Sequence, residues 1–150
     1  MSPSLVIGMM VVSGALMAFQ GPINAALRTH VGVFESSLIS FLVGTAVLVA
    51  IVLIKREGSL LAARNAAWWQ LTGGLIGAVF VTTTLIAAPQ IGVTGMIVAA
   101  LCGQIAGGLL IDRFGWVQIS AKPIDLTRLA GLALLAVSVV LINWGNLKKA

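Results

Sequence analysis

The chain has 150 residues, of which 59% are hydrophobic and 9% are charged, and its mean hydropathy is +1.10. Soluble domains carry about 25% charged residues, and a soluble chain of this composition would expose an aggregation-prone apolar surface. Disordered segments are poor in apolar residues, so the composition excludes disorder as well. It indicates a small integral membrane protein.

Charged residues divide the chain into runs long enough to cross a bilayer. Runs without Asp, Glu, Lys or Arg cover residues 1–27, 36–54, 65–111 and 129–147. A spanning helix needs about 20 residues, so the third run holds two helices, with a turn at residues 88–92. The first run has no Lys or Arg ahead of its apolar part, and we interpret it as a retained helix rather than a signal peptide. We predict one all-α domain with five transmembrane helices over residues 5–27, 36–54, 68–88, 92–111 and 127–146.

Residues typical of the membrane–water interface lie near the predicted helix ends. Tryptophan is enriched at this level of the bilayer. The candidate anchors are Trp68, Trp69, Trp116, Trp144 and Asp112. Asp112 is followed by Arg113, and we expect the two charges to neutralise each other or to reach the lipid headgroups.

The distribution of basic residues predicts an orientation. With five spans, the side that carries the N-terminus receives Lys55, Arg56, Arg64, Arg113, Lys122 and Arg128, and the other side receives Arg28, Lys148 and Lys149. The positive-inside rule therefore favours a cytoplasmic N-terminus, by a small margin. The net charge of +5 is spread over segments beside the spans, so lipid headgroups explain it and we expect no nucleic-acid partner.

The first span carries a polar face. Ser13, Gln20 and Asn24 are separated by seven and four residues, which places them on one side of a helix. Gly21 and Pro22 lie beside them and predict a hinge, because proline frees a carbonyl one turn earlier. Two interpretations remain open. The amides line a substrate cavity, or they are interhelical hydrogen bonds worth about 0.6 kcal/mol each.

The other spans contain small and hydroxyl side chains. In the second span, Ser37 and Ser40 lie at helical spacing and favour close packing. In the third, the threonines at 82–84 are expected to bond to carbonyls of their own helix. In the fourth, small residues recur every four positions, which lets another helix approach, either in this chain or in a second subunit. This predicted packing ridge is Ala99, Gly103 and Gly107, flanked by Gln104 and Gly108.

Charged side chains and histidine are absent from the centre of every predicted span. No Asp, Glu, Lys, Arg or His lies there, whereas proton-coupled transporters rely on such groups. The sequence has no metal-binding, nucleotide-binding or nucleophilic motif, so we expect neither a metal, a cofactor nor an enzymatic activity.

Three segments resemble a known family. They are residues 14–27 (GALMAFQGPINAAL), residues 40–44 (SFLVG), and Gly103-Gln104 followed by LIDRFG at 110–115. These are similar to the YdcZ-type family, a bacterial five-helix branch of the drug/metabolite transporter superfamily. The resemblance covers essentially the whole chain and implies a multi-pass protein of the bacterial inner membrane.

The resemblance also implies an architecture and a function. Larger members of the superfamily contain two inverted five-helix repeats, so a second copy of this chain or a homologous sister subunit, in the opposite orientation, would complete the transporter. We expect a small-molecule exporter working by alternating access, with Gln20, Asn24 and Ser13 binding a neutral or zwitterionic polar substrate. Related four-helix exporters use a membrane-embedded glutamate, and the amides here argue against proton antiport. The alternative is a non-transporting membrane scaffold that binds a partner helix through the ridge on the fourth span.

Overall fold

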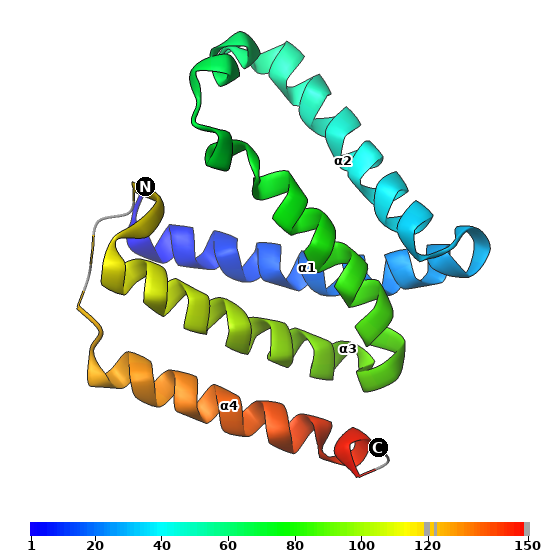
Figure 1. The fold of residues 1–150 in the computed structure, drawn as a ribbon, viewed down its shortest axis with the longest axis vertical. Helices are drawn as coiled ribbons and strands as arrows, with labels where there is room; N and C mark the ends of the chain where they lie inside the picture. The colour runs from blue at the N-terminus through cyan, green and yellow to red at the C-terminus, as the bar shows by residue number, and fades with distance from the viewer. Residues whose placement is uncertain (119–120, 122, 149–150) are drawn as a thin grey trace. The chain divides into compact units, whose positions relative to one another are not determined.

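The computed structural model describes residues 1–118, 121 and 123–148, and its regular elements are all helical. Lys122 and Lys149, which entered the prediction of orientation, lie outside the described residues. Four long helices are α1 (Pro3–Val31), α2 (Val33–Lys55), α3 (Gly73–Phe114) and α4 (Leu126–Leu147) (Figure 1). Short 3₁₀ helices are η1 (Leu60–Asn65), η2 (Trp68–Leu71) and η3 (Trp116–Gln118). The predicted all-α membrane fold is confirmed.

The helices are long and apolar enough to cross a membrane, and α3 exceeds one crossing. Its 42 residues correspond to about 63 Å of helix in total, roughly twice the thickness of the hydrocarbon core. Gly92 has φ 76° and ψ 162°, which interrupts the helix and leaves a segment on either side that is long enough to span. Glycine fits here because it adopts a positive φ without steric cost.

Two compact units divide the chain, residues 1–86 and residues 87–150. In the first, the principal interhelical contact joins α1 and α2. The sequence predicts an eight-residue connection at 28–35, but the structure needs only Gly32, whose φ is 101°. Its N–H donates to the Arg28 carbonyl over 2.9 Å, and a Cβ there would clash with the Glu35 carboxylate. Both helices therefore continue through the expected loop.

In the second unit, α4 runs antiparallel to the part of α3 that follows Gly92. At one end, Asn146 Nδ2 donates to the Ile91 carbonyl over 3.3 Å. At the other, Arg128 Nη1 lies 3.0 Å from Asp112 Oδ2. The two helices are thus tied near both ends.

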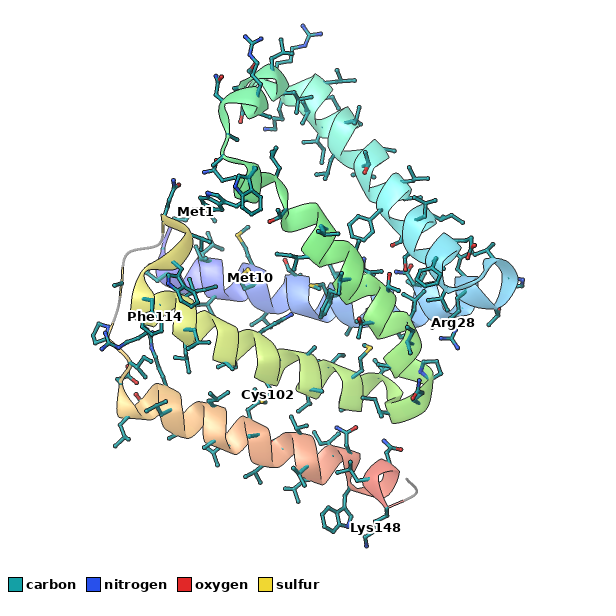
Figure 2. All side chains as sticks on the ribbon, in the orientation of Figure 1. Met1, Met10, Arg28, Cys102, Phe114 and Lys148 are labelled. Atoms are coloured by element: carbon teal, nitrogen blue, oxygen red, sulfur yellow. The ribbon has the colours of Figure 1, made fainter. Side chains whose placement is uncertain are left out.

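Burial is inverted relative to a soluble protein. Large apolar side chains project outward along all the helices (Figure 2). Several of the most buried side chains are polar, namely Asn24, Ser36, Ser37 and Asn143. This is the arrangement expected when the surrounding solvent is lipid, because polar groups then find hydrogen-bond partners only inside the protein.

Candidate functional site

A cluster of hydrogen-bonding side chains joins the three helices of residues 1–86. We call it the polar junction, and it consists of Asn24 and Arg28 from α1, Ser36, Ser37 and Ser40 from α2, and Thr82 from α3. All lie on helices, where short side chains at three- and four-residue spacing share a face.

The bonds between α1 and α2 centre on Asn24. Its Nδ2 donates to Ser40 Oγ over 3.1 Å, and the Ser36 hydroxyl donates to the Asn24 main-chain carbonyl over 2.8 Å. Asn24 is 5% exposed and Ser36 is fully buried. Asn24 therefore makes an interhelical hydrogen bond, as one of the two interpretations of the sequence requires.

Thr82 extends the junction to α3. Its hydroxyl donates to Ser37 Oγ over 3.1 Å, whereas Thr83 and Thr84 donate to Val79 and Val81 of their own helix. The expectation that all three threonines bond within the helix is therefore wrong for Thr82. It lies on the side of α3 that faces α2, where a neighbouring hydroxyl competes with the helix carbonyl.

Arg28 binds a carbonyl that proline leaves without a helical donor. Pro89 has no N–H, so the carbonyl four residues earlier, that of Leu85, lacks its usual partner. The Arg28 guanidinium donates to this oxygen through Nη1, and the Leu85 residue is fully buried. A partly buried charged donor thereby satisfies a main-chain acceptor away from water. Sequence reasoning placed Arg28 in a loop and missed this role.

The other residues predicted to bind substrate or to form the hinge lie outside the polar junction. Gln20 and Ser13 are exposed, and neither side chain has a hydrogen bond within the part of the chain that the structure describes. Gly21 is buried and Pro22 half-buried, and α1 continues through both. The structure thus brings Asn24 into the polar junction and leaves Gln20 and Ser13 outside it.

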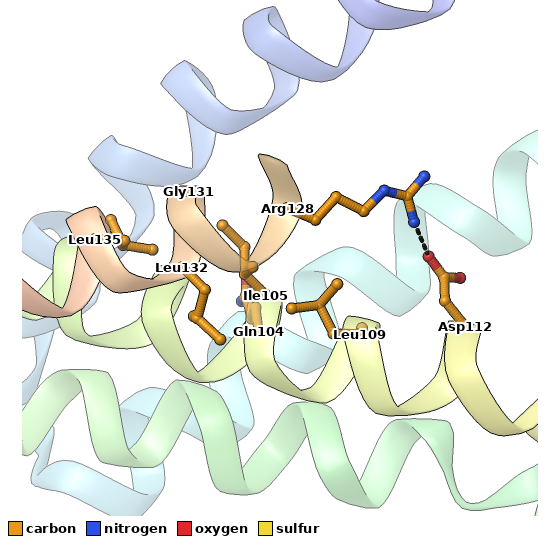
Figure 3. Close-up of a pocket in the computed structure, with 9 residues that line it drawn as sticks. Gln104, Ile105, Leu109, Asp112, Arg128, Gly131, Leu132 and Leu135 are labelled. Carbon is orange, nitrogen blue, oxygen red and sulfur yellow. Dashed lines mark hydrogen bonds and ion pairs between the residues drawn. The ribbon is translucent and has the colours of Figure 1, made fainter. Parts of the chain in front are cut away.

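A groove of about 590 Å³ lies between α3 and α4 within the second unit. Its lining is mostly apolar and includes Ile105, Leu109, Leu132 and Leu135, with Gln104, Gly108 and Gly131 beside them (Figure 3). The Asp112–Arg128 ion pair lies at one end of the groove. Glycines on both helices create the space, since they place no side chain in it.

The predicted ridge and its flanks occupy different faces of α3. Gln104 and Gly108 line the groove, whereas Ala99, Gly103 and Gly107 are not among its lining residues. A Cβ built at Gly103 or Gly107 would meet no atom of the described residues within 4 Å, apart from the backbone of its own helix. The ridge is therefore uncovered within residues 87–150.

The predicted anchors are exposed or half-buried near helix ends. Trp68, Trp69, Trp116 and Trp144 are exposed; the Trp116 ring stacks on Phe114 at 5.2 Å, and Lys148 Nζ lies 5.3 Å from the centre of the Trp144 ring. Asp112 does not pair with its neighbour Arg113 as expected. Successive side chains point in different directions around a helix, and Asp112 pairs instead with Arg128 of α4.

No group of three or more His, Cys, Asp or Glu side chains that could hold a metal occurs among the described residues.

Comparisons with known proteins agree with the sequence and the fold. The family model described as "Putative inner membrane exporter, YdcZ" matches residues 5–141. The chain is 26% identical to "Inner membrane protein YdcZ" of Escherichia coli (strain K12) over 119 residues, which cover 76% of this chain and 78% of that protein. No solved structure matches the chain significantly. The resemblance and the inner-membrane location are confirmed.

Proposed function

We propose that this chain, which belongs to the YdcZ family of inner membrane exporters, exports a small polar molecule by alternating access as a dimer of two five-helix subunits. The observation that carries the proposal is the match to the exporter family over residues 5–141. The family is one of transporters rather than enzymes, and the apolar helices agree with a multi-pass protein.

The sparse internal packing supports a dimer. Leu85 and Ser36 are the largest fully buried side chains among the described residues, and the ridge at Gly103 and Gly107 has open space around it. Small residues on a membrane helix let a second helix approach closely. A second copy packed on this ridge, in the opposite orientation, completes the pair of repeats.

The substrate is proposed to be neutral or zwitterionic and polar. Asn24 is the buried amide of α1, and Gln20, one turn earlier, has an exposed amide that is available to a ligand. Ser13 lies on the same face. Gly21 and Pro22 are the proposed hinge, since proline weakens the helix between these groups.

Transport is tested in liposomes that contain the purified protein and are loaded with labelled amino acids, sugars and polyols. At least one solute is expected to leave faster than from protein-free liposomes, and Gln20→Ala is expected to slow that efflux while the protein remains folded. Normal efflux by Gln20→Ala would remove the site assignment. Association without efflux of any solute, with association abolished by Gly103→Leu, would favour the scaffold.

Orientation is tested by labelling single cysteines in a Cys102→Ser background. His30 and Glu57 are exposed and flank α2 at its two ends, so a spanning α2 places them on opposite sides of the membrane. For an antiparallel homodimer, a membrane-impermeant maleimide labels each of His30→Cys and Glu57→Cys partly from outside the cell and fully after permeabilisation. Labelling of one position only from outside would exclude dual orientation and direct attention to a sister subunit.

A further inference from the structure

We propose that the groove between α3 and α4 binds one membrane phospholipid with an amine-bearing zwitterionic headgroup, such as phosphatidylethanolamine. The site goes beyond the proposed export function and uses different residues. Its basis is the apolar lining, the level of the ion pair in the membrane, and the signs of the charges.

Like a lipid molecule, the groove is apolar along most of its length and charged at one end. Ile105, Leu109, Leu132 and Leu135 line it, and the charged pair stands at one end (Figure 3). Leu135 lies seven residues beyond Arg128 on α4, or about 10 Å along the helix. An acyl chain that follows these leucines buries apolar surface without leaving a polar group of its own unpaired.

The ion pair lies at headgroup level. Asp112 is two residues before the end of α3, and Arg128 is in the first turn of α4. Trp116 follows shortly after, and tryptophan is typical of the membrane–water interface. A lipid with its chain among the leucines therefore places its phosphate and amine beside this pair.

Both charged side chains have capacity for a ligand. Arg128 uses Nη1 for Asp112 and Nε for Asp125 Oδ2, at 3.0 and 3.5 Å, and a guanidinium has five N–H groups. The side chains of Arg128 and Asp112 are 41% and 33% exposed, so a headgroup reaches them. Arg128 then donates to a phosphate oxygen, and the Asp112 carboxylate accepts from an ammonium group.

The balance of charge selects the headgroup. One carboxylate and one guanidinium, those of Asp112 and Arg128, line this end of the groove, so the lining carries no net charge; Asp125 and Arg113 lie outside it. Basic clusters at the membrane surface recruit anionic lipids, and a lining without excess positive charge does not attract them in this way. Phosphatidylethanolamine supplies both a phosphate for Arg128 and an amine for Asp112, whereas phosphatidylglycerol lacks the amine.

The proposal is tested by native mass spectrometry of the purified full chain in detergent with equal amounts of phosphatidylethanolamine and phosphatidylglycerol. The wild-type protein is expected to retain phosphatidylethanolamine preferentially, and Asp112→Asn is expected to lose this preference. Gly131→Leu fills the groove and is expected to lose the bound lipid. Gly145→Leu is the matched control, because Gly145 is also an α4 glycine with open space but lies outside the groove, and it is expected to retain the lipid.

Three results would overturn the proposal. They are preferential retention of phosphatidylglycerol, equal lipid retention by Gly131→Leu and Gly145→Leu, and dissociation of a wild-type dimer by Gly131→Leu with lipid retention unchanged. The last result would assign the groove to a second copy of the chain. Helical circular dichroism identifies a variant that fails to fold, and Asp112→Asn then still tests headgroup selection because it leaves the groove volume unchanged.

Discussion

In residues 1–86, α1, α2 and α3 meet through buried hydrogen bonds between short side chains, whereas in residues 87–150 the two helices are tied near their ends and leave a groove between them. Hydroxyls such as Ser36 reach a neighbouring carbonyl only when the helix axes are close, so the helices of the first unit approach one another at the polar junction. Facing glycines at Gly108 and Gly131 leave the second unit open. Small polar residues therefore join helices in a membrane, while small apolar residues without a partner create binding space.

The largest expected effect concerns the first unit and Arg28. Arg28→Leu leaves the buried Leu85 carbonyl without a donor, and we expect the free energy of unfolding to fall by about 1–3 kcal/mol. Pro89→Ala restores an N–H for the same carbonyl, so the double variant Arg28→Leu/Pro89→Ala should recover most of the loss. The measurement is a double-mutant cycle from dodecyl sulfate titrations in mixed micelles, followed by circular dichroism. Additive losses would show that Arg28 acts through some other contact.

The next effect concerns the tied end of the second unit. A Cβ at Gly95 would clash with the side-chain oxygen of Asn143, so Gly95→Ala is expected to lower the free energy of unfolding by about 1–3 kcal/mol. Gly131→Ala is the control, because a Cβ there meets open space and alanine favours a helix by about 1 kcal/mol over glycine. The same unfolding titration compares them. Equal stabilities would mean that α3 and α4 are not in close contact at Gly95.

A smaller effect compares the two buried asparagines directly. Asn24→Leu removes the bond to Ser40 and is expected to cost about 0.6–1.7 kcal/mol, the range for polar contacts between membrane helices. Asn143 bonds to Val139 of its own helix and more weakly to Gly95, and its Oδ1 is buried with no partner among the described residues. Asn143→Leu removes this unsatisfied acceptor and should cost less. A larger loss of unfolding free energy for Asn143→Leu than for Asn24→Leu would mean that the buried asparagine of the second unit, and not that of the first, contributes more to stability.

The fold follows from the sequence to a large extent because lipid imposes few solutions. Uncharged runs of about 20 residues form helices when no water is present to satisfy the backbone. The exact ends are harder to predict: a single glycine, Gly32, replaces an expected eight-residue connection, because helices continue as far as the backbone geometry permits. In α3, Gly92 interrupts the helix within the predicted turn at 88–92.

The site is less accessible to sequence reasoning. Periodicity places Asn24 and Gln20 on one side of α1, but a pattern within one helix does not reveal that Asn24, and not Gln20, donates to Ser40. The pairing of Arg28 with Leu85 spans 57 residues, and the only local signal is the missing N–H of Pro89. Tertiary contacts of this kind depend on how helices cross, which spacing does not specify.

The smallest expected effect concerns Asp125 at the start of α4. The Thr127 hydroxyl, the Arg128 backbone N–H and the Arg128 charge hold the pKa of the Asp125 carboxyl below its ordinary value. A carboxyl with a lowered pKa stabilises the fold above its ordinary pKa, and this contribution is lost as the pH falls through the lower, folded value. Asp125→Ala should therefore lower the melting temperature slightly at pH 7, and in acid its difference from wild type should shrink toward its difference from Asp125→Asn, because a protonated carboxyl still offers a capping oxygen. The melting temperature of Asp125→Asn at pH 7 should lie between those of wild type and Asp125→Ala, because an amide oxygen still caps the helix. A difference that is as large in acid as at pH 7 would mean that the ionised carboxylate is not what holds the beginning of α4, and the charged end of the second unit would then resemble the uncharged contacts of the first.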